Sequence, residues 1–245
     1  MENEEMRNEQ IERITYYEEL MTRTGETLSA GRSSAAGFAR VQENLKKLSS
    51  YYGSEEWKKD FEADEKGALP SDLKRGVLSE DGLYDLLEEG KEWTDSVLES
   101  LLSKEYHIVD ILPRQVAKYQ DGQYFEIEKY YLESTRIREL RKKYADLLIK
   151  LNCYCDICVC LIRPSEEEMG GWTVNPGPGV LEGALGDERF ENCSLDVVIP
   201  VENALLTLSG SDTYMTVYNA GEDLLGLIKA LALAEGLFLW KPEEE

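Results

Sequence analysis

The chain has 245 residues, of which 42% are hydrophobic, and it carries 49 acidic side chains against 27 lysines and arginines. The formal charge of −22 disfavours direct binding to nucleic acid or to an anionic membrane, and it favours a basic partner. The acid excess is common to both halves, with 24 acids and 13 bases up to Ser103 and 25 acids and 14 bases after it.

Several features predict a cytoplasmic protein. The first residues, Met1–Glu5, have neither the basic nor the apolar region of a secretory signal. The stretch richest in apolar residues, Leu224–Trp240, is interrupted by Gly226, Lys229 and Glu235, so we predict no membrane span. Four of the five cysteines fall within eight residues, which is not typical of a secreted disulfide framework.

Residues 4–102 are predicted to be almost wholly helical. Glycines and alanines weaken the helical pattern early on and predict a turn within Gly25–Ser34. Ser54 and Ser79, each followed by two acids, are predicted to cap two later helices, with a break at Gly67–Ser71 between them. The simplest arrangement is an antiparallel bundle of three main helices and a short one. Helical three- and four-residue spacing is clearest at Phe38, Val41, Leu45 and Leu48.

The middle of this helical half carries a distinctive pattern. It consists of Tyr51–Trp57 (YYGSEEW), Asp60–Glu65 (DFEADE), Leu69–Pro70, Asp72–Asp81 (DLKRGVLSED) and Leu83–Tyr84. The pattern resembles the domain-of-unknown-function 4298 family of small bacterial proteins, over about residues 8–103 and most specifically between residues 51 and 90. The resemblance implies a helical fold. Because the family carries no established activity or catalytic residues, it leaves the function open.

From residue 104 the pattern changes to mixed strands and helices. Ile137–Leu151 repeats its apolar residues every three or four positions and predicts an amphipathic helix. Ser209–Asp212 predicts a hairpin turn, and Asn219 with Glu222 predicts the start of a helix that runs through Ala234. Strands are predicted at Tyr106–Leu112, Cys153–Ile162, Leu195–Ile199, Asn203–Leu208, Thr213–Tyr218 and Leu237–Trp240.

These patterns predict an α+β protein with two domains. Residues 1–103 would form the antiparallel helical bundle. Residues 104–245 would form a domain with a mainly antiparallel sheet and two main helices.

Four cysteines lie close together, at Cys153, Cys155, Cys158 and Cys160. Four thiolates would suit zinc or an iron–sulfur cluster. The side chains of a strand alternate between its faces, however, so the first two cysteines would face one side and the last two the other. We therefore interpret them as small apolar core residues and assign no metal or cofactor. A metal or redox site, or a nucleophile, stays as the alternative.

The single histidine, His107, lies among apolar residues in a predicted strand. One imidazole excludes histidine-rich zinc sites and paired-histidine catalysis within one chain, and no serine lies in a G-x-S-x-G motif. We interpret His107 as a structural residue. Aspartates near the predicted strands would be able to bind a divalent cation or form an acid–base pair, although their spacing selects none of them: Asp110, Asp121, Asp156, Asp196 and Asp212.

Two glycine-containing segments, Gly170–Gly171 and Asn175–Gly179, lack the Lys-Ser/Thr of a phosphate-binding loop. The prolines of the second segment remove backbone donors, so both segments are predicted to be surface loops. Trp172 beside them would make this a binding loop, because exposed aromatic residues anchor partners. Glu166–Glu168 is predicted to be a solvated loop and Glu243–Glu245 a frayed end.

Aromatic residues recur in the helical half, where most would pack the core and the rest would contact the second half or a partner. They are Tyr16, Tyr17, Tyr51, Tyr52, Trp57, Phe61, Tyr84 and Trp93. Basic residues are interleaved with acids, even in the basic stretch Arg136–Lys143, so a nucleic-acid-binding groove is not predicted.

We predict an acidic, non-enzymatic protein that binds a basic protein partner as an adaptor, a regulator, or an inhibitor or immunity-type blocker. One alternative is a nucleic-acid mimic that occupies the nucleic-acid-binding channel of another protein. The lysines and arginines interleaved with the acidic residues weaken this alternative. The other is an enzyme of unrecognised type with a carboxylate or cysteine site in the C-terminal domain. We predict no direct nucleic-acid binding, no membrane binding and no cofactor.

Overall fold

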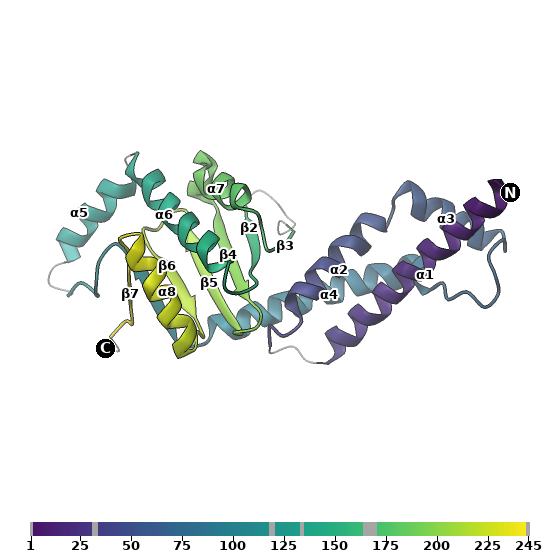
Figure 1. The fold of residues 1–245 in the computed structure, drawn as a ribbon, viewed down its shortest axis with the longest axis horizontal. Coiled ribbons are helices and arrows are strands. Elements are labelled where there is room, and N and C mark those ends of the chain that lie inside the picture. The colour runs from purple at the N-terminus through teal and green to yellow at the C-terminus, as the bar shows by residue number, and fades with distance from the viewer. Residues whose placement is uncertain (1, 31–33, 118–120, 133–134, 164–170, 244–245) are drawn as a thin grey trace. The chain divides into compact units, whose positions relative to one another are not determined.

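The computed structural model describes residues 2–30, 34–117, 121–132, 135–163 and 171–243. The chain divides into two compact units, Met1–Val97 and Leu98–Glu245. The first consists of helices and the second of an antiparallel sheet with helices, so the predicted α+β class is confirmed (Figure 1). Within the described ranges, no helix combines the length and the apolar character needed to cross a bilayer.

The first helix ends at Ser29, inside the segment Gly25–Ser34 where a turn is predicted. This helix continues past Gly25, because its inner face is buried through Thr24 and Leu28 and tertiary packing outweighs the cost of one glycine. The predicted cap of the third helix is confirmed, since Ser54 Oγ accepts a hydrogen bond from Trp57 N at 3.1 Å. The helical elements of the unit are α1 (Glu2–Ser29), α2 (Phe38–Tyr51), α3 (Glu55–Glu65), the 3₁₀ turn η1 (Gly76–Leu78) and α4 (Glu80–Leu102).

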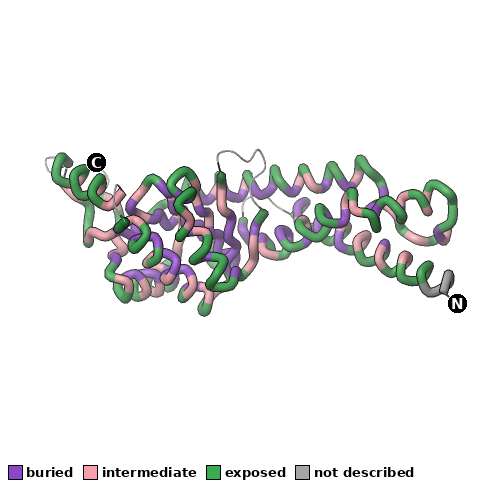
Figure 2. The backbone as a smooth tube through the Cα atoms, turned by 90° about the horizontal axis from the view of Figure 1, so that it is seen from above, coloured by how far each residue is buried: buried purple, intermediate pink, exposed green. Residues whose placement is uncertain are grey.

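The core of the first unit is apolar but contains paired polar groups. Buried positions recur along each helix (Figure 2), and the rings of Phe38 and Trp93 lie 5.7 Å apart. Thr94 Oγ1 accepts a hydrogen bond from Gln42 Nε2 at 2.7 Å and donates to a backbone carbonyl of α4. Because these buried polar groups have partners, they fix how α2 lies against α4 rather than destabilising the core.

The second unit contains a seven-stranded sheet in the order β3-β2-β4-β5-β6-β1-β7, and all neighbouring strands are antiparallel. The first strand along the chain, β1, lies between the last two, β6 and β7. The strands are β1 (Tyr106–Asp110), β2 (Cys158–Ile162), β3 (Thr173–Val174), β4 (Ser194–Ile199), β5 (Ala204–Ser209), β6 (Met215–Tyr218) and β7 (Phe238–Trp240).

One face of this sheet packs against helices to form the main core of the second unit. Figure 1 shows α6 and α8 lying over that face. Alternate residues of the central strands, such as Val109, Val197 and Val217, point into this core, and their neighbours in sequence point to the opposite face. The helical elements of the unit are α5 (Asp121–Leu132), α6 (Arg136–Leu151), α7 (Pro178–Gly186), the 3₁₀ helix η3 (Glu188–Asn192) and α8 (Glu222–Ala234).

Two predictions for this unit are wrong at the level of local structure. The loop predicted at Asn175–Gly179 contains the start of α7, because Pro178 occupies the first helical turn, where its missing N–H costs nothing. Asn219 does not cap α8. It adopts a left-handed conformation with φ 56° and donates from Nδ2 to the carbonyl of Asn203, and the helix begins after Gly221.

Gly210 is predicted to be irreplaceable, because a Cβ there would overlap the backbone carbonyl of Phe190. We expect Gly210→Ala to lower the free energy of unfolding by about 3 kcal/mol, since rigid backbone must move to make room. In the matched control Gly226→Ala, the new Cβ meets no atom within 4 Å. Alanine there should raise the free energy of unfolding by about 0.5–1 kcal/mol through helix propensity. Urea unfolding followed by circular dichroism measures both, and equal stability of Gly210→Ala and wild type would contradict the close approach.

Candidate functional site

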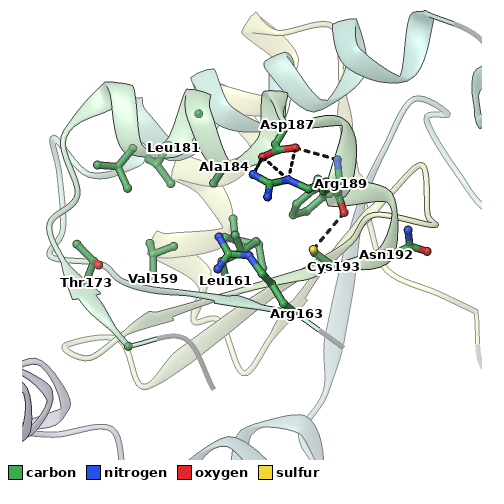
Figure 3. A pocket seen from close by; sticks show the side chains of 15 residues that line it. Val159, Leu161, Arg163, Thr173, Leu181, Ala184, Asp187, Arg189, Asn192 and Cys193 are labelled. Atoms are coloured by element: carbon green, nitrogen blue, oxygen red, sulfur yellow. Dashed lines mark hydrogen bonds and ion pairs between the residues drawn. The ribbon is translucent and has the colours of Figure 1, made fainter. Parts of the chain in front are cut away.

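A hollow of the second unit, with a volume of about 890 Å³, lies between strands β2 and β4 and helix α7 (Figure 3), and we call it the larger hollow. Its floor is apolar and includes Val159 and Leu195, and Leu181 of α7 lines it from the opposite side. Arg163 and Arg189 bring positive charge to it, and Cys193 lies at its edge.

The polar groups of this hollow are largely committed to each other. Asp187 accepts a hydrogen bond from Arg189 Nη2 at 2.7 Å and another from the Arg189 backbone N at 2.9 Å. These contacts lower the pKa of Asp187 to about 2, so it is an ionised partner of the arginine rather than a general acid. Cys193 Sγ donates to the carbonyl of Arg189 at 3.2 Å. The geometry therefore suits binding better than acid–base catalysis.

A second hollow, of about 520 Å³, lies over strands β6, β1 and β7. The antiparallel register places Tyr106 opposite Tyr218 and Ile108 opposite both Thr216 and Trp240, so these side chains share one face of the sheet. The rings of Tyr106 and Tyr218 are 5.8 Å apart. We call this site the aromatic hollow, after the residues Tyr106, Tyr124, Phe125, Tyr214, Tyr218 and Trp240 that line it.

Asp110 is the carboxylate of the aromatic hollow, and only 3% of it is exposed. Its Oδ1 accepts a hydrogen bond from the backbone N of Ile111 at 2.6 Å. Burial raises the pKa of Asp110 to about 6, and the nearby Glu128 adds to the shift. Burial, with the charges of Glu128 and Asp110, also raises the pKa of Tyr124 to about 12. The hollow therefore carries buried negative charge at neutral pH, and no ion pair among the described residues supplies a cation to balance it.

The ion pairs found among the described residues support this conclusion, since none of them involves Asp110. Lys241, which follows Trp240 in the chain, pairs with Glu105. Trp240 Nε1 is a buried donor without a partner in the described part of the chain. An aromatic surface with a buried carboxylate can bind a cationic group that also has an apolar part.

The first unit has a buried carboxylate of a different kind. Asp60 is fully buried and accepts hydrogen bonds from Arg13 Nε at 2.8 Å, Gln10 Nε2 at 2.9 Å and the Tyr51 hydroxyl at 2.8 Å. Tyr51 in turn stacks on Tyr17 with 3.9 Å between ring centroids. Gln10 and Arg13 come from α1 and Tyr51 from α2, so Asp60 of α3 joins the three helices.

The comparisons with known proteins bear on this first unit. Residues 14–100 match the model of the family described as "Domain of unknown function (DUF4298)". The first unit contains a DUF4298 domain. The chain matches no curated protein and no solved structure. The aromatic hollow and the larger hollow both lie beyond the residues that the family model matches.

Within the DUF4298 domain, the distinctive sequence pattern has a structural role. Trp57 Nε1 donates to the carbonyl of Val77 at 3.1 Å, and the backbone N of Val77 donates to Glu18 Oε2 at 2.7 Å. Arg75 forms an ion pair with Asp64. These contacts hold the segment before α4 against α1 and α3. The residues of the distinctive sequence pattern therefore have a structural role.

The strand predicted at Cys153–Ile162 is wrong in its first half. α6 ends at Leu151, and the backbone N atoms of Tyr154 and Cys155 donate to the Leu151 carbonyl at 2.9 and 3.2 Å, so β2 begins only at Cys158. The cysteines therefore do not alternate across one strand as expected.

The structure separates the cysteines by burial. Cys153 is exposed and Cys155 half-buried, whereas Cys158 and Cys160 are buried in β2 as small apolar residues. Burial raises the pKa of Cys160 to about 12, with a contribution from Asp196, which disfavours the thiolate that a nucleophile needs. Among the residues that the structure describes, no cluster of three or more potential metal ligands is found.

His107 is half-buried in β1 on the core-facing side of the strand, and burial lowers its pKa. Of the five predicted aspartates, Asp110 lines the aromatic hollow, whereas Asp156 accepts a hydrogen bond from Asn175 Nδ2 at 2.9 Å. Burial raises the pKa of Asp196 to about 6 and also raises the pKa of Asp212. The described side chains of this set do not converge on one metal site, and the side chain of Asp121 lies outside the described part.

Other predicted residues also have places in the structure. Trp172 is only 7% exposed, so the expectation of an exposed anchor is wrong. Glu166–Glu168 and Gly170 lie outside the described residues, as do Glu244 and Glu245. In the DUF4298 domain, Tyr51, Trp57 and Trp93 belong to the core, and Tyr16 and Tyr84 are exposed.

The sequence analysis identified none of the six aromatic residues of the hollow as members of a site, and it placed Asp110 only among generic candidates. Helix α5, which supplies Tyr124 and Phe125, was missed because its apolar residues do not repeat along one face. The detectable signal was an excess of aromatic residues near the ends of predicted strands, such as Tyr106, Tyr218 and Trp240. Only the strand order brings these residues together.

The Asp60 cluster predicts a large stability effect in the DUF4298 domain. We expect Asp60→Asn to lower the free energy of unfolding by about 3 kcal/mol, since it leaves the partly buried Arg13 without its counter-charge. The matched control Glu55→Gln removes an exposed pair with Lys58 and should leave the free energy of unfolding nearly unchanged, because water screens exposed ion pairs. Thermal and urea unfolding measure both variants, and similar effects of the two would contradict the role of Asp60.

The raised pKa of Asp110 predicts how stability depends on pH. The folded protein holds this proton up to about pH 6, whereas the unfolded chain releases it near pH 4, so the free energy of unfolding should fall between these values by about 3 kcal/mol from this group. Asp110→Asn should remove the part of this pH dependence that comes from Asp110. Asp196→Asn should remove a second part over the same pH range, because the pKa of Asp196 is also raised to about 6. Urea unfolding of the wild type and both variants at pH 4, 5, 6 and 7 tests this prediction. If the stability of Asp110→Asn depended on pH as that of the wild type does, the prediction would be contradicted.

Proposed function

We propose that this chain is an acidic, non-enzymatic interaction protein that binds a basic protein partner. The observation that carries the proposal is the aromatic hollow, in which Asp110 is buried without a cation of its own among the described ion pairs. The partner would be regulated, recruited or blocked by this binding.

Charge and aromatic surface would have different roles in such an interaction. The excess of 22 negative charges would attract a basic partner over a distance and speed encounter, particularly at low salt. Aromatic residues that are desolvated on contact with the partner would supply most of the binding free energy. Phe125 and Tyr106 are 58% and 43% exposed, so part of the hollow is open to a partner.

We also propose that the protein acts in the cytoplasm of a bacterium. The five cysteines all lie in described segments and none of them forms a disulfide bond, which suits a reducing compartment. The DUF4298 domain resembles a family of small bacterial proteins, and it would serve as a helical scaffold or as a second contact surface.

The larger hollow, of about 890 Å³, does not favour a second function. Asp187 is held as the counter-ion of Arg189, so it is not available as an acid or base at neutral pH. Helix α6 does not support the alternative of a nucleic-acid mimic, because its exposed side carries basic residues such as Arg138 and Lys142.

The proposal predicts a salt-sensitive basic partner. The tagged full-length chain, incubated with extract of the source organism, should retain a protein with pI above about 9. The purified pair should bind at least about tenfold more weakly at 0.5 M than at 0.05 M NaCl, because the attraction is screened.

An unrelated acidic protein of the same net charge serves as the control for unspecific adsorption. Retention of the same proteins by both baits would contradict a specific interaction. Binding to an acidic partner, or a dissociation constant that does not change with salt, would contradict the proposed function.

A further inference from the structure

The aromatic hollow has the features of a site for one particular side chain. Only 3% of Asp110 is exposed, and its carboxylate accepts hydrogen bonds from the neutral backbone N–H groups of Ile111 and Leu112. Burying an ionised carboxylate is costly unless a cation or several donors compensate for it. Since no described ion pair includes Asp110, the compensating cation is absent from this part of the chain itself.

The walls of the hollow suit a cation with a flat or apolar body. Trp240 and Tyr218 lie on the same face of the sheet as Asp110, and α5 brings Tyr124 to the same cavity. Aromatic rings attract cations to their electron-rich faces, and the rings of tryptophan and tyrosine do so well. The hydroxyl of Tyr124 lies 3.4 Å from Glu128 Oε1, which adds a second carboxylate near Asp110.

The local charges of the second unit support the same occupant. Glu105, beside Tyr106, holds Lys241 in an ion pair, so this nearby lysine is already neutralised. Glu128 is close enough to Asp110 to raise its pKa, which shows that negative charge is concentrated here. A cavity of about 520 Å³ lies in the size range of small-molecule sites and holds one long side chain with its adjoining backbone.

Resting on the proposed function, we propose that the aromatic hollow receives an arginine side chain of the basic partner. The guanidinium faces Asp110, and its planar face lies against the rings of Trp240 and Tyr218. Arginine fits better than lysine, because its guanidinium is planar, stacks on aromatic rings and donates two parallel hydrogen bonds to a carboxylate. Lysine would offer only a compact charge.

The first test uses a small probe and the full-length chain. Titration of the ¹⁵N-labelled protein with N-acetyl-arginine amide should shift the indole N–H signal of Trp240 in a saturable manner. The signal is assigned by its loss in Trp240→Phe. The citrulline analogue has nearly the same shape without the charge and should bind at least about tenfold more weakly, and the lysine analogue should fall between them.

Variants of the chain locate the site. Asp110→Asn should weaken binding of N-acetyl-arginine amide at least about tenfold, since the charge is lost while the shape is kept. The matched control Glu202→Gln removes an exposed carboxylate that does not line the hollow and should leave the affinity unchanged. Tyr124→Phe is a second variant that keeps the ring, and circular dichroism confirms that each variant is folded.

The outcomes separate this inference from the proposed function. Equal binding of the arginine and citrulline probes, or equal loss in Asp110→Asn and Glu202→Gln, would overturn the arginine site. A captured basic partner that binds Asp110→Asn as tightly as wild type would also overturn it, yet would leave the acidic interaction protein standing. Loss of the partner in Asp110→Asn alone supports both.

Discussion

The insertion of β1 between β6 and β7 is the constraint on which the candidate site depends. Antiparallel pairing fixes the register, and side chains alternate between the faces of each strand, so Tyr106 and Asp110 must share a face with Tyr218 and Trp240. A shift of β1 by one residue would turn Asp110 toward the helices and bring the core residue Val109 to the hollow. Burial of the apolar face of β1 against the helices therefore fixes the register that places Tyr106 and Asp110 on the opposite face.

Buried carboxylates have opposite roles in the two units. In the DUF4298 domain, Asp60 has an arginine, a glutamine and a tyrosine around it, so its charge is compensated and it joins helices. In the second unit, Asp110 has its backbone contact but no described ion pair. The first arrangement is typical of a structural network, and the second is typical of a binding site.

The sequence predicted elements well where a local rule was strong. The amphipathic repeat of Ile137–Leu151 gave α6 almost to the residue, and Ser54 with its following acids gave the start of α3. It failed where tertiary contacts prevailed over local preference. Cys153 lies in a turn after α6 instead of in the strand, which begins only at Cys158, and Asn219 does not cap α8, which begins after Gly221.

The sequence by itself determined the acidity of the chain, the α+β class and the resemblance of its helical half to the DUF4298 family. Each depends on composition or on short-range patterns, which are complete in the chain before it folds. Only the tertiary structure decided that Asp110 would lie among aromatic residues more than 100 positions away, such as Tyr218 and Trp240. The order of strands in a sheet depends on long-range packing of its apolar face, and no local pattern encodes it.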